Sequence, residues 1–442
     1  MANRKQFLSL IGGGAASFSI ASLIRNGSEI TNEVYNVNTF GAVGDGKTPS
    51  ANAFQEAIDK AESDGGGVVL IPPGKYILEK TPLIGSNVHL KGSGPGTVLT
   101  GERTGNYQGA ALISNKGQQA SGYDGASGWS ISNLAIDSPK TNGIVVTHAS
   151  NVYISHIYGI EAFHHFIDTA GLNILCENLF LTGHSGTSTF QIDSLGNAQS
   201  IWDGQQAVSP NLDGTQTKNL ILRSSIITAT AGTEGNRPRH DTSIHFHGEV
   251  SEGIILSDLI LGGAENGIYM DDGLSYSNMQ ISNITSYNHG RAIWFEESPI
   301  RQEQISIRGL IHQPEINADK AGEYCSITIY ATDGLSLCGL QLKSPEDLPC
   351  KNAIELYSCS KAELSGIKAK GFGGTAILIS DDLNRSDKKS NYIQIHGSIF
   401  EGFEYGLSKT SSHEDDEFIE WGNLFIDVKN QHKGTFKTLT TR

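Results

Sequence analysis

Residues 243–298 carry three short apolar runs with the same polar decoration: SIHFHG from Ser243, GIYMDD from Gly267 and AIWFEE from Ala292. Side chains alternate along an extended strand, so one apolar set from each run shares a face. That set is Ile244, Phe246, Ile268, Met270, Ile293 and Phe295. The pattern predicts three stacked strands with these six side chains inside.

The opposite face of these predicted strands carries two columns of functional side chains. One column holds His245, Tyr269 and Trp294, and the next holds His247, Asp271 and Glu296. Strands stacked in parallel lie about 4.8 Å apart, which would pack rings, imidazoles and carboxylates side by side. A solvated sheet face would carry Lys, Thr, Ser and Glu. This composition instead favours a sugar-binding cleft.

A six-residue unit recurs along the chain and predicts a solenoid. It reads apolar, any, apolar, Ser or small, then Asn, Asp, Gly or His, then apolar. Copies begin at Trp129, Val152, Ile254, Met279, Ile305, Leu335, Ala362 and Ile393, with looser ones at Leu172 and Leu220. The third positions Leu256, Ile281 and Ile307 are 25 and 26 residues apart. That period suits a coil of three short strands and is too short for a full helix in each repeat.

A second strand follows each unit, and its last outward residue forms one long column. The column is predicted to run Asp168, Asp193, His247, Asp271, Glu296, Tyr330, Tyr357 and Ser380. We therefore expect residues 130–405 to form stacked parallel coils. Insertions at 228–242, 312–323 and 343–352 fall between the first and second strands, where loops gather beside functional surfaces.

Composition limits the class of protein and its partners. The 442 residues include 52 glycines and 12 prolines, and 18% are charged, which fits strands and tight turns better than a coiled coil or a disordered chain. A net charge of -15 argues against nucleic acid as a partner and disfavours a polyanionic substrate. The five cysteines lack metal-ligand spacing. Buried free thiols are favoured over a disulfide of Cys338 or Cys350 with Cys359.

Residues 1–29 are predicted to be an export signal. Arg4 and Lys5 precede an apolar run from Phe7 to Ile24, and the segment resembles a twin-arginine signal with lysine as the second basic residue. A membrane anchor is the alternative interpretation, although the run is short and poorly hydrophobic for a span. We expect an exported protein, periplasmic or secreted, with a single domain over residues 34–430.

The start of that domain carries the most specific pattern in the chain. Ser50 precedes a helical apolar stripe and is expected to cap the helix, and a strand is expected over Val68–Ile71. The stripe consists of Ala51, Phe54, Ala57, Ile58 and Ala61. FGAVGDGKT at 40–48 and GGGVVLIPPGKY at 65–76 resemble the opening of pectate-lyase-superfamily proteins, which include polygalacturonases and some phage tailspikes. The resemblance implies an all-β, right-handed parallel β-helix with an N-terminal capping helix, typical of carbohydrate-active enzymes.

Asp271 and Glu296 are the first candidates for catalysis. Glycosidic cleavage uses one carboxyl as acid and a second as base or nucleophile, and adjacent coils would place these two about 5 Å apart at the backbone. The doublets with Asp272 and Glu297 add repulsion that would raise one carboxyl pKa. The alternatives are a solvated strand end and a calcium site, and no other cofactor is expected.

The neighbouring side chains suit saccharide binding and proton transfer. Tyr269 and Trp294 can pack against sugar C–H faces, although ladder aromatics can also simply stack on each other. His245 and His247 project from one strand and can bind hydroxyls, act as a base or bind a metal with Asp271.

A second constellation precedes the same strands. HDTSI from His240, ENGI from Glu265 and HGRAI from His289 partly resemble the NTD, DD and GHG motifs of polygalacturonases, with only the His-Gly pair literal. The resemblance implies that Asp241 and Glu265 are the carboxylates and His289 their neighbour.

Taken together, these features predict an enzyme that cleaves a poly- or oligosaccharide. The main hypothesis is a glycoside hydrolase or related glycosyl-transferring enzyme using carboxylate acid/base catalysis. The alternative is a uronate lyase, because Arg237, Arg239 and Arg291 can neutralise a carboxylate while His247 or Tyr269 takes the C5 proton. A non-catalytic glycan-binding protein is the third hypothesis.

Overall fold

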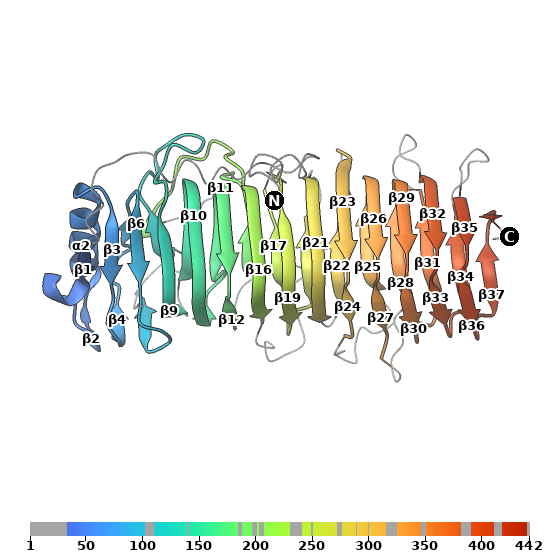
Figure 1. The fold of residues 1–442 in the computed structure, drawn as a ribbon, viewed down its shortest axis with the longest axis horizontal. Helices are drawn as coiled ribbons and strands as arrows, with labels where there is room; N and C mark the ends of the chain where they lie inside the picture. The colour runs from blue at the N-terminus through green and yellow to red at the C-terminus, as the bar shows by residue number, and fades with distance from the viewer. Residues whose placement is uncertain are drawn as a thin grey trace, which may run out of the picture.

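The chain winds into a parallel β-solenoid with three long faces (Figure 1). The computed structural model describes residues 33–101, 110–138, 141–183, 188–196, 201–202, 207–229, 241–248, 251–271, 276–288, 290–298, 300–314, 325–345, 351–381, 390–410 and 418–439. Within these residues, one hydrogen-bonded network joins 36 strands. The predicted all-β parallel fold is confirmed, and the export segment and Cys350 lie outside the described residues.

Face 1 carries the strands with the functional columns. Its strands are β5 (Leu83–Ile84), β8 (Ala111–Asn115), the starts of β10 (Asn142–Ala162) and β11 (Ile167–Glu177), β13 (Ser188–Ile192), β17 (Thr242–Phe246), β20 (Asn266–Met270), β22 (Arg291–Phe295), β25 (Cys325–Tyr330), β28 (Asn352–Tyr357), β31 (Thr375–Ser380), β34 (Tyr405–Lys409) and β37 (Asn430–Lys433).

Face 2 is built from the first strand of each coil. Its strands are β1 (Val34–Asn36), β3 (Gly67–Leu70), β6 (Val88–Lys91), the start of β9 (Ser130–Ser138), later parts of β10 and β11, the starts of β16 (Lys218–Thr228), β19 (Ile255–Gly262) and β21 (Tyr276–Tyr287), β18 (Ser251–Glu252), β23 (Gln302–Arg308), β26 (Thr332–Cys338), β29 (Ser360–Ser365), β32 (Asn391–His396), β35 (Phe418–Trp421) and β38 (Lys437–Thr438).

Face 3 completes each coil. Its strands are β2 (Asp45–Pro49), β4 (Gly74–Ile77), β7 (Thr97–Thr100), the ends of β9, β10, β16, β19 and β21, β12 (Phe180–Thr182), β24 (Ile311–His312), β27 (Gln341–Lys343), β30 (Lys368–Lys370), β33 (Ile399–Glu401) and β36 (Leu424–Ile426). A separate antiparallel pair joins β14 (Ile201–Trp202) to β15 (Ala207–Val208).

The fifth residue of the recurring unit makes the corner between faces 2 and 3. In the eight clear copies it is Asn133, His156, Asp258, Asn283, Gly309, Gly339, Gly366 and Gly397, and φ lies between 52° and 66° in all of them. This left-handed region is disfavoured for most L-residues and tolerated by Gly, Asn and Asp. The repeat therefore reflects a left-handed residue at this corner of each of these coils.

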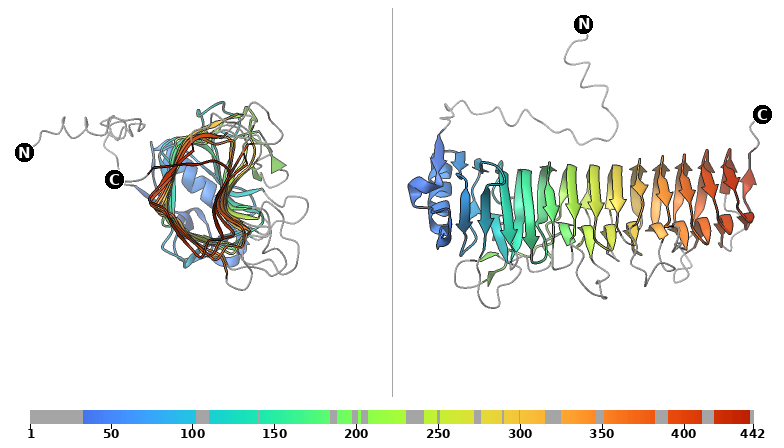
Figure 2. Two further views of the ribbon diagram at one scale, coloured as in Figure 1. Left: turned by 90° about the vertical axis from the view of Figure 1, so that its right-hand side faces the viewer. Right: turned by 90° about the horizontal axis from the view of Figure 1, so that it is seen from below.

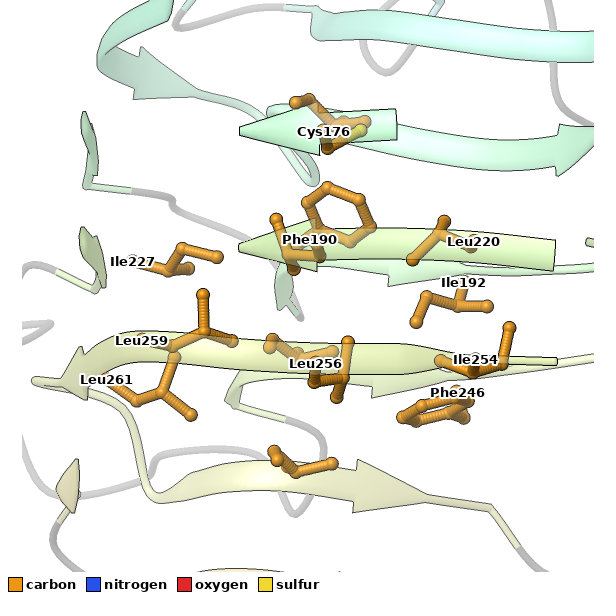
Figure 3. Packing of buried hydrophobic residues seen from close by; sticks show 14 of the residues in the cluster. Cys176, Phe190, Ile192, Leu220, Ile227, Phe246, Ile254, Leu256, Leu259 and Leu261 are labelled. Carbon is orange, nitrogen blue, oxygen red and sulfur yellow. The ribbon is translucent and has the colours of Figure 1, made fainter. Parts of the chain in front are cut away.

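The core fills the space between the three faces, as Figure 3 shows for Phe190, Ile192 and Phe246. All six side chains predicted to point inward are 0% exposed, and the list is Ile244, Phe246, Ile268, Met270, Ile293 and Phe295. The same residue type in successive coils stacks on its neighbours, which buries a continuous apolar column. The predicted inward set is confirmed.

The N-terminal end of this core is covered by the 3-10 turn η2 (Val37–Phe40) and helix α2 (Ala51–Ser63), which lies across the solenoid end (Figure 2). The predicted stripe of α2 is fully buried. The predicted cap is wrong in its mechanism, because Ser50 Oγ accepts the Val43 N–H at 3.2 Å and no helix N–H. Ala51 N–H instead donates to Glu79 Oε2 at 3.1 Å, so the Glu79 carboxylate accepts a hydrogen bond from the first turn of the helix.

The thiols agree with the simpler interpretation. Cys176, Cys325, Cys338 and Cys359 are free, so the alternative disulfide between Cys338 and Cys359 is absent. Burial raises the pKa of Cys359 to about 12, which keeps this thiol protonated and unreactive. No helix in the described part of the chain is long and apolar enough to cross a membrane.

The left-handed corner predicts unequal losses of folding stability for two substitutions at Asn283, whose φ is 54°. Asn283→Val should lower the free energy of unfolding by about 1–2 kcal/mol, because a β-branched side chain is strained in the left-handed region. Asn283→Gly should cost less, and Gln280→Val, at an exposed strand position of the same coil, should change it by less than about 0.5 kcal/mol. Urea unfolding measures all three. Equal losses for Val and Gly would contradict this prediction.

Candidate functional site

The candidate site lies on face 1 across β13, β17, β20 and β22. Pairing of β17 with β20 and of β20 with β22 aligns His245, Tyr269 and Trp294 in one column. Gln191 precedes His245 in this column, and Asp168 pairs with Gln191. The prediction that Asp168 belongs to the column of Asp193 is therefore wrong, because the strand pairing places it two residues earlier.

The second predicted column continues the ladder just beyond the strand ends. The backbone N–H groups of His247, Asp271 and Glu296 donate to carbonyls of the preceding coil at 2.9, 3.3 and 3.1 Å. In the coil before them, the backbone N–H of Asp193 donates to Thr169 O at 2.8 Å. Asp193, His247, Asp271 and Glu296 thus follow one another on successive rungs, as predicted.

The centre of the site is an imidazole between two aspartates. His247 Nδ1 lies 3.1 Å from Asp193 Oδ1, and His247 Nε2 lies 3.8 Å from Asp271 Oδ2. The hydrogen bond that His247 Nδ1–H donates to Asp193, together with the charge of Asp271, raises the pKa of His247 to about 9. His247 is therefore an imidazolium at neutral pH, with its side chain 30% exposed.

Asp193 is itself held firmly beneath the surface. Its side chain is 2% exposed, and it accepts hydrogen bonds from Gln191 Nε2 at 2.8 Å and from Ser194 N–H at 2.7 Å. With His247, three groups hydrogen-bond to this buried carboxylate and fix its orientation. Asp193 is positioned to fix the Nδ1–H tautomer of neutral His247 and to hold Nε2 on the side of Asp271.

Asp271 contacts a second imidazole in addition to His247. His245 Nε2 lies 3.2 Å from Asp271 Oδ1, and the His245 side chain is 5% exposed against 18% for Asp271. The rings of His245 and His247 are 5.4 Å apart. Two imidazoles thus face the Asp271 carboxylate, whereas the acid of a glycosidase lies in surroundings that favour its neutral form.

The aromatic column is a stack that opens to solvent at one end only. Tyr269 lies between His245 and Trp294, at centroid distances of 5.2 and 5.0 Å, and is only 1% exposed. Tyr269 therefore presents no ring face to a sugar in this structure, and the stacking alternative describes it. Trp294 is partly exposed, and the Arg291 guanidinium carbon lies 4.2 Å above its ring. Arg291 Nε also donates to Thr328 Oγ1 at 3.2 Å.

The second constellation lies at the other end of the same strands. Asp241 and Glu265 immediately precede β17 and β20, six residues before His247 and Asp271, so the two sets are separated by about 20 Å of extended chain. Asp241 is buried and Glu265 partly exposed. His289, Asp272, Arg237 and Arg239 lie outside the described residues. The two predicted carboxylate sets cannot belong to one reaction centre.

Two further observations complete the site. Among the described residues, no group of three or more His, Cys, Asp or Glu side chains is arranged to hold a metal ion. The sequence analysis placed Asp193 in the outward column but assigned it no role. Its signal was its register with His247, since neighbouring rungs place a carboxylate beside an imidazole.

Comparison with known proteins identifies the fold, but the family model matches only a segment that precedes this site. Residues 34–160 match the family model described as rhamnogalacturonase A/epimerase, pectate lyase-like. Alginate lyase 7 of Azotobacter vinelandii is 43% identical over 72 residues, which are 15% of this chain and 8% of that protein. Mannuronan C5-epimerase AlgE6 of the same organism is 36% identical over 120 residues, 22% of this chain and 14% of that protein.

A solved structure covers almost the whole chain. The surface adhesin PfbA of Streptococcus pneumoniae superposes with a TM-score of 0.64 at 17% identity, over 87% of this chain and 93% of that one. At this identity the likeness shows the fold alone. The resemblance to pectate-lyase-like right-handed β-helix proteins is confirmed, and every candidate site residue lies beyond the segment that the family model matches.

The ion pair of Asp193 and His247 gives a testable pH dependence. Because the folded-state pKa of His247 is raised to about 9, its stabilising effect is fully present below the unfolded pKa of about 6.5 and is lost as pH rises through about 9. The effect should be about 2 kcal/mol after solvent screening of the partly exposed ring. Asp193→Asn should return the His247 titration, followed by NMR of the imidazole C–H, toward its ordinary range. An unchanged titration would contradict the pairing.

Proposed function

We propose that this pectate-lyase-like right-handed β-helix protein cleaves a uronate-containing polysaccharide by β-elimination on face 1. The observation that carries the proposal is the arrangement of His247, whose Nδ1 is held by the buried Asp193 while Nε2 lies 3.8 Å from Asp271 Oδ2, on a ring that is 30% exposed. An imidazole oriented in this way by an aspartate is suited to proton abstraction. The similarity to an alginate lyase and to mannuronan epimerases supports uronate chemistry.

The proposed reaction needs a base and a group that neutralises the uronate carboxylate. Neutral His247 takes the C5 proton on Nε2, the C4–O bond breaks, a C4–C5 double bond forms, and the leaving oxygen takes a proton from water. Asp193 is a positioning residue that holds the imidazole. Arg291 supplies a permanent positive charge for a carboxylate, and the exposed part of Trp294 supplies a surface for the sugar ring.

Calcium is a further candidate for charge neutralisation, as Asp271 and Glu296 lie on adjacent rungs. The proposed reaction is written without a calcium-dependent step, so chelation with EDTA is expected to leave turnover unchanged. Loss of turnover on chelation would instead assign charge neutralisation to calcium. Export to the periplasm or the cell exterior, where such polysaccharides occur, belongs to the same proposal.

The second candidate function is glycoside hydrolysis by Asp271 and Glu296. Their position on neighbouring rungs favours it, since paired carboxylates about 5 Å apart suit a retaining mechanism. The imidazolium beside Asp271 argues against that residue as the acid, which leaves Glu296, 7% exposed, to fill the role. The structure thus favours the elimination over the hydrolysis.

A panel of polysaccharides separates these functions. Alginate, polygalacturonate and neutral glucans are incubated with the protein, and both ultraviolet absorbance and reducing ends are recorded. Elimination yields an unsaturated uronate that absorbs ultraviolet light, and hydrolysis yields reducing ends without absorbance. Absorbance with a uronate polymer is expected. Reducing ends alone would establish the hydrolase, and retained binding without either product would indicate a binding protein.

Substitutions identify the base and its pH dependence. His247→Gln should lower kcat by about 10²–10⁴-fold, because proton abstraction is lost while the fold is kept. Since a base must be deprotonated, kcat/KM should rise as pH increases to about 9. Asp193→Asn should move that rise to lower pH. A decline of activity through pH 9 would show instead that the imidazolium is the active form.

Matched variants at the other carboxylates provide the control. Glu296→Gln should leave kcat within a few-fold of the parent if elimination is the reaction, and it should abolish turnover if hydrolysis is. Asp241→Asn and Glu265→Gln, at the opposite ends of the strands, should have little effect. Loss of turnover in these two variants alone would move the reaction to the constellation that resembles polygalacturonases.

A further inference from the structure

A groove on face 2, near the C-terminal end of the solenoid, lies apart from the site on face 1. It has a volume of about 500 Å³ and is lined by Lys361, Ala362, Glu363, Tyr392 and Gln394. These residues belong to β29 and β32, which lie side by side in the orange-red part of Figure 1. The volume falls within the range of small-ligand sites.

The rim of the groove is made by two residues in a strained backbone conformation. Lys361 and Tyr392 both have φ of 51° and occupy equivalent positions on adjacent coils, at the corner between faces 1 and 2. In earlier coils the same corner is occupied by residues suited to this conformation, namely Asn151, Asn173, Asn219, Gly253, Asn278 and Gly334, with Gln304 as an exception. A bulky residue at positive φ is an outlier, and such strain concentrates at ligand sites.

The side chains at the groove are available for a ligand. Tyr392 is 56% exposed, and in the described part of the chain neither its hydroxyl nor the Lys361 ammonium has a side-chain hydrogen bond or ion pair. Beyond Gln394, Glu363 contacts His396 at 3.1 Å, and His396 stacks on Trp421 at 4.3 Å with nearly parallel rings. The surface therefore offers aromatic faces on both sides of an amide, with a free cation at one edge.

We propose that this groove is an accessory binding site for a uronate-containing saccharide chain. A sugar ring packs on Tyr392, its carboxylate pairs with Lys361, and its hydroxyls bind Gln394 and Glu363. A peptide fits less well, because β29 and β32 are both paired on each side and offer no free edge for strand addition. The choice of a uronate rests on the proposed function, whereas the groove itself does not.

Affinity electrophoresis through gels containing alginate or polygalacturonate tests the site. The parent protein should be retarded, and Tyr392→Asn should weaken retardation at least several-fold. Asn suits a positive φ, so this variant should melt at or above the temperature of the parent. Lys361→Ala should weaken retardation by uronate polymers more than by a neutral glucan. Tyr287→Asn, at a tyrosine that is 43% exposed on face 3, is the matched control and should leave retardation unchanged.

The outcomes separate this inference from the proposed reaction. Retardation that depends on Tyr392 without any turnover would support the groove and reject the enzyme. Turnover with unchanged retardation of Tyr392→Asn, or a parent that no gel retards, would overturn the groove. If both the groove and the proposed reaction are correct, Tyr392→Asn should raise KM for the polymer several-fold. It should leave KM and kcat for short oligosaccharides unchanged, as expected for binding outside the reaction centre.

Discussion

The left-handed residue at the corner between faces 2 and 3 is the constraint on which the rest of the solenoid depends. A residue with φ near 60° makes this corner in the eight clear copies of the repeat, and few residue types tolerate this conformation without cost. The corner occurs at the same place in each of these coils, so the strands on either side begin and end in the same register. Identical registers stack apolar side chains into continuous columns and polar side chains into continuous columns on the outer faces.

Column stacking explains how the site forms without long-range contacts. Asp193, His247 and Asp271 come from three successive coils, yet each is a nearest neighbour of the next because its backbone is one rung away. A single coil would carry an isolated imidazole or carboxylate. Three coils in register place a cation between two anions, and this arrangement raises the pKa of His247. The electrostatics of the site thus follow from the repeat.

The sequence predicted the features that depend on the period of the repeat. It did not predict features that depend on neighbouring segments, on strand register or on side-chain partners. The six inward residues and the outer columns across β17, β20 and β22 follow from strand alternation, and the apolar stripe of α2 follows from the helical period; all are observed. The burial of Tyr269 depends on what covers the strand, which alternation does not encode. Asp168 was misplaced because the apolar run before it also suits a shifted register. At Ser50 the competing partner was Glu79, which is 29 residues away in sequence and adjacent in space.

A solenoid can change one rung without disturbing distant ones, because each coil contacts only its neighbours. Departures from the local rule are therefore informative about function. At the corner between faces 1 and 2, most coils use Asn or Gly, whereas Lys361 and Tyr392 accept backbone strain to present long side chains. No contact in the described structure offsets the backbone strain at these two residues. A bound ligand that contacts their side chains would explain it. The same argument singles out His247, where a solvated strand end would need no buried carboxylate beneath an imidazole.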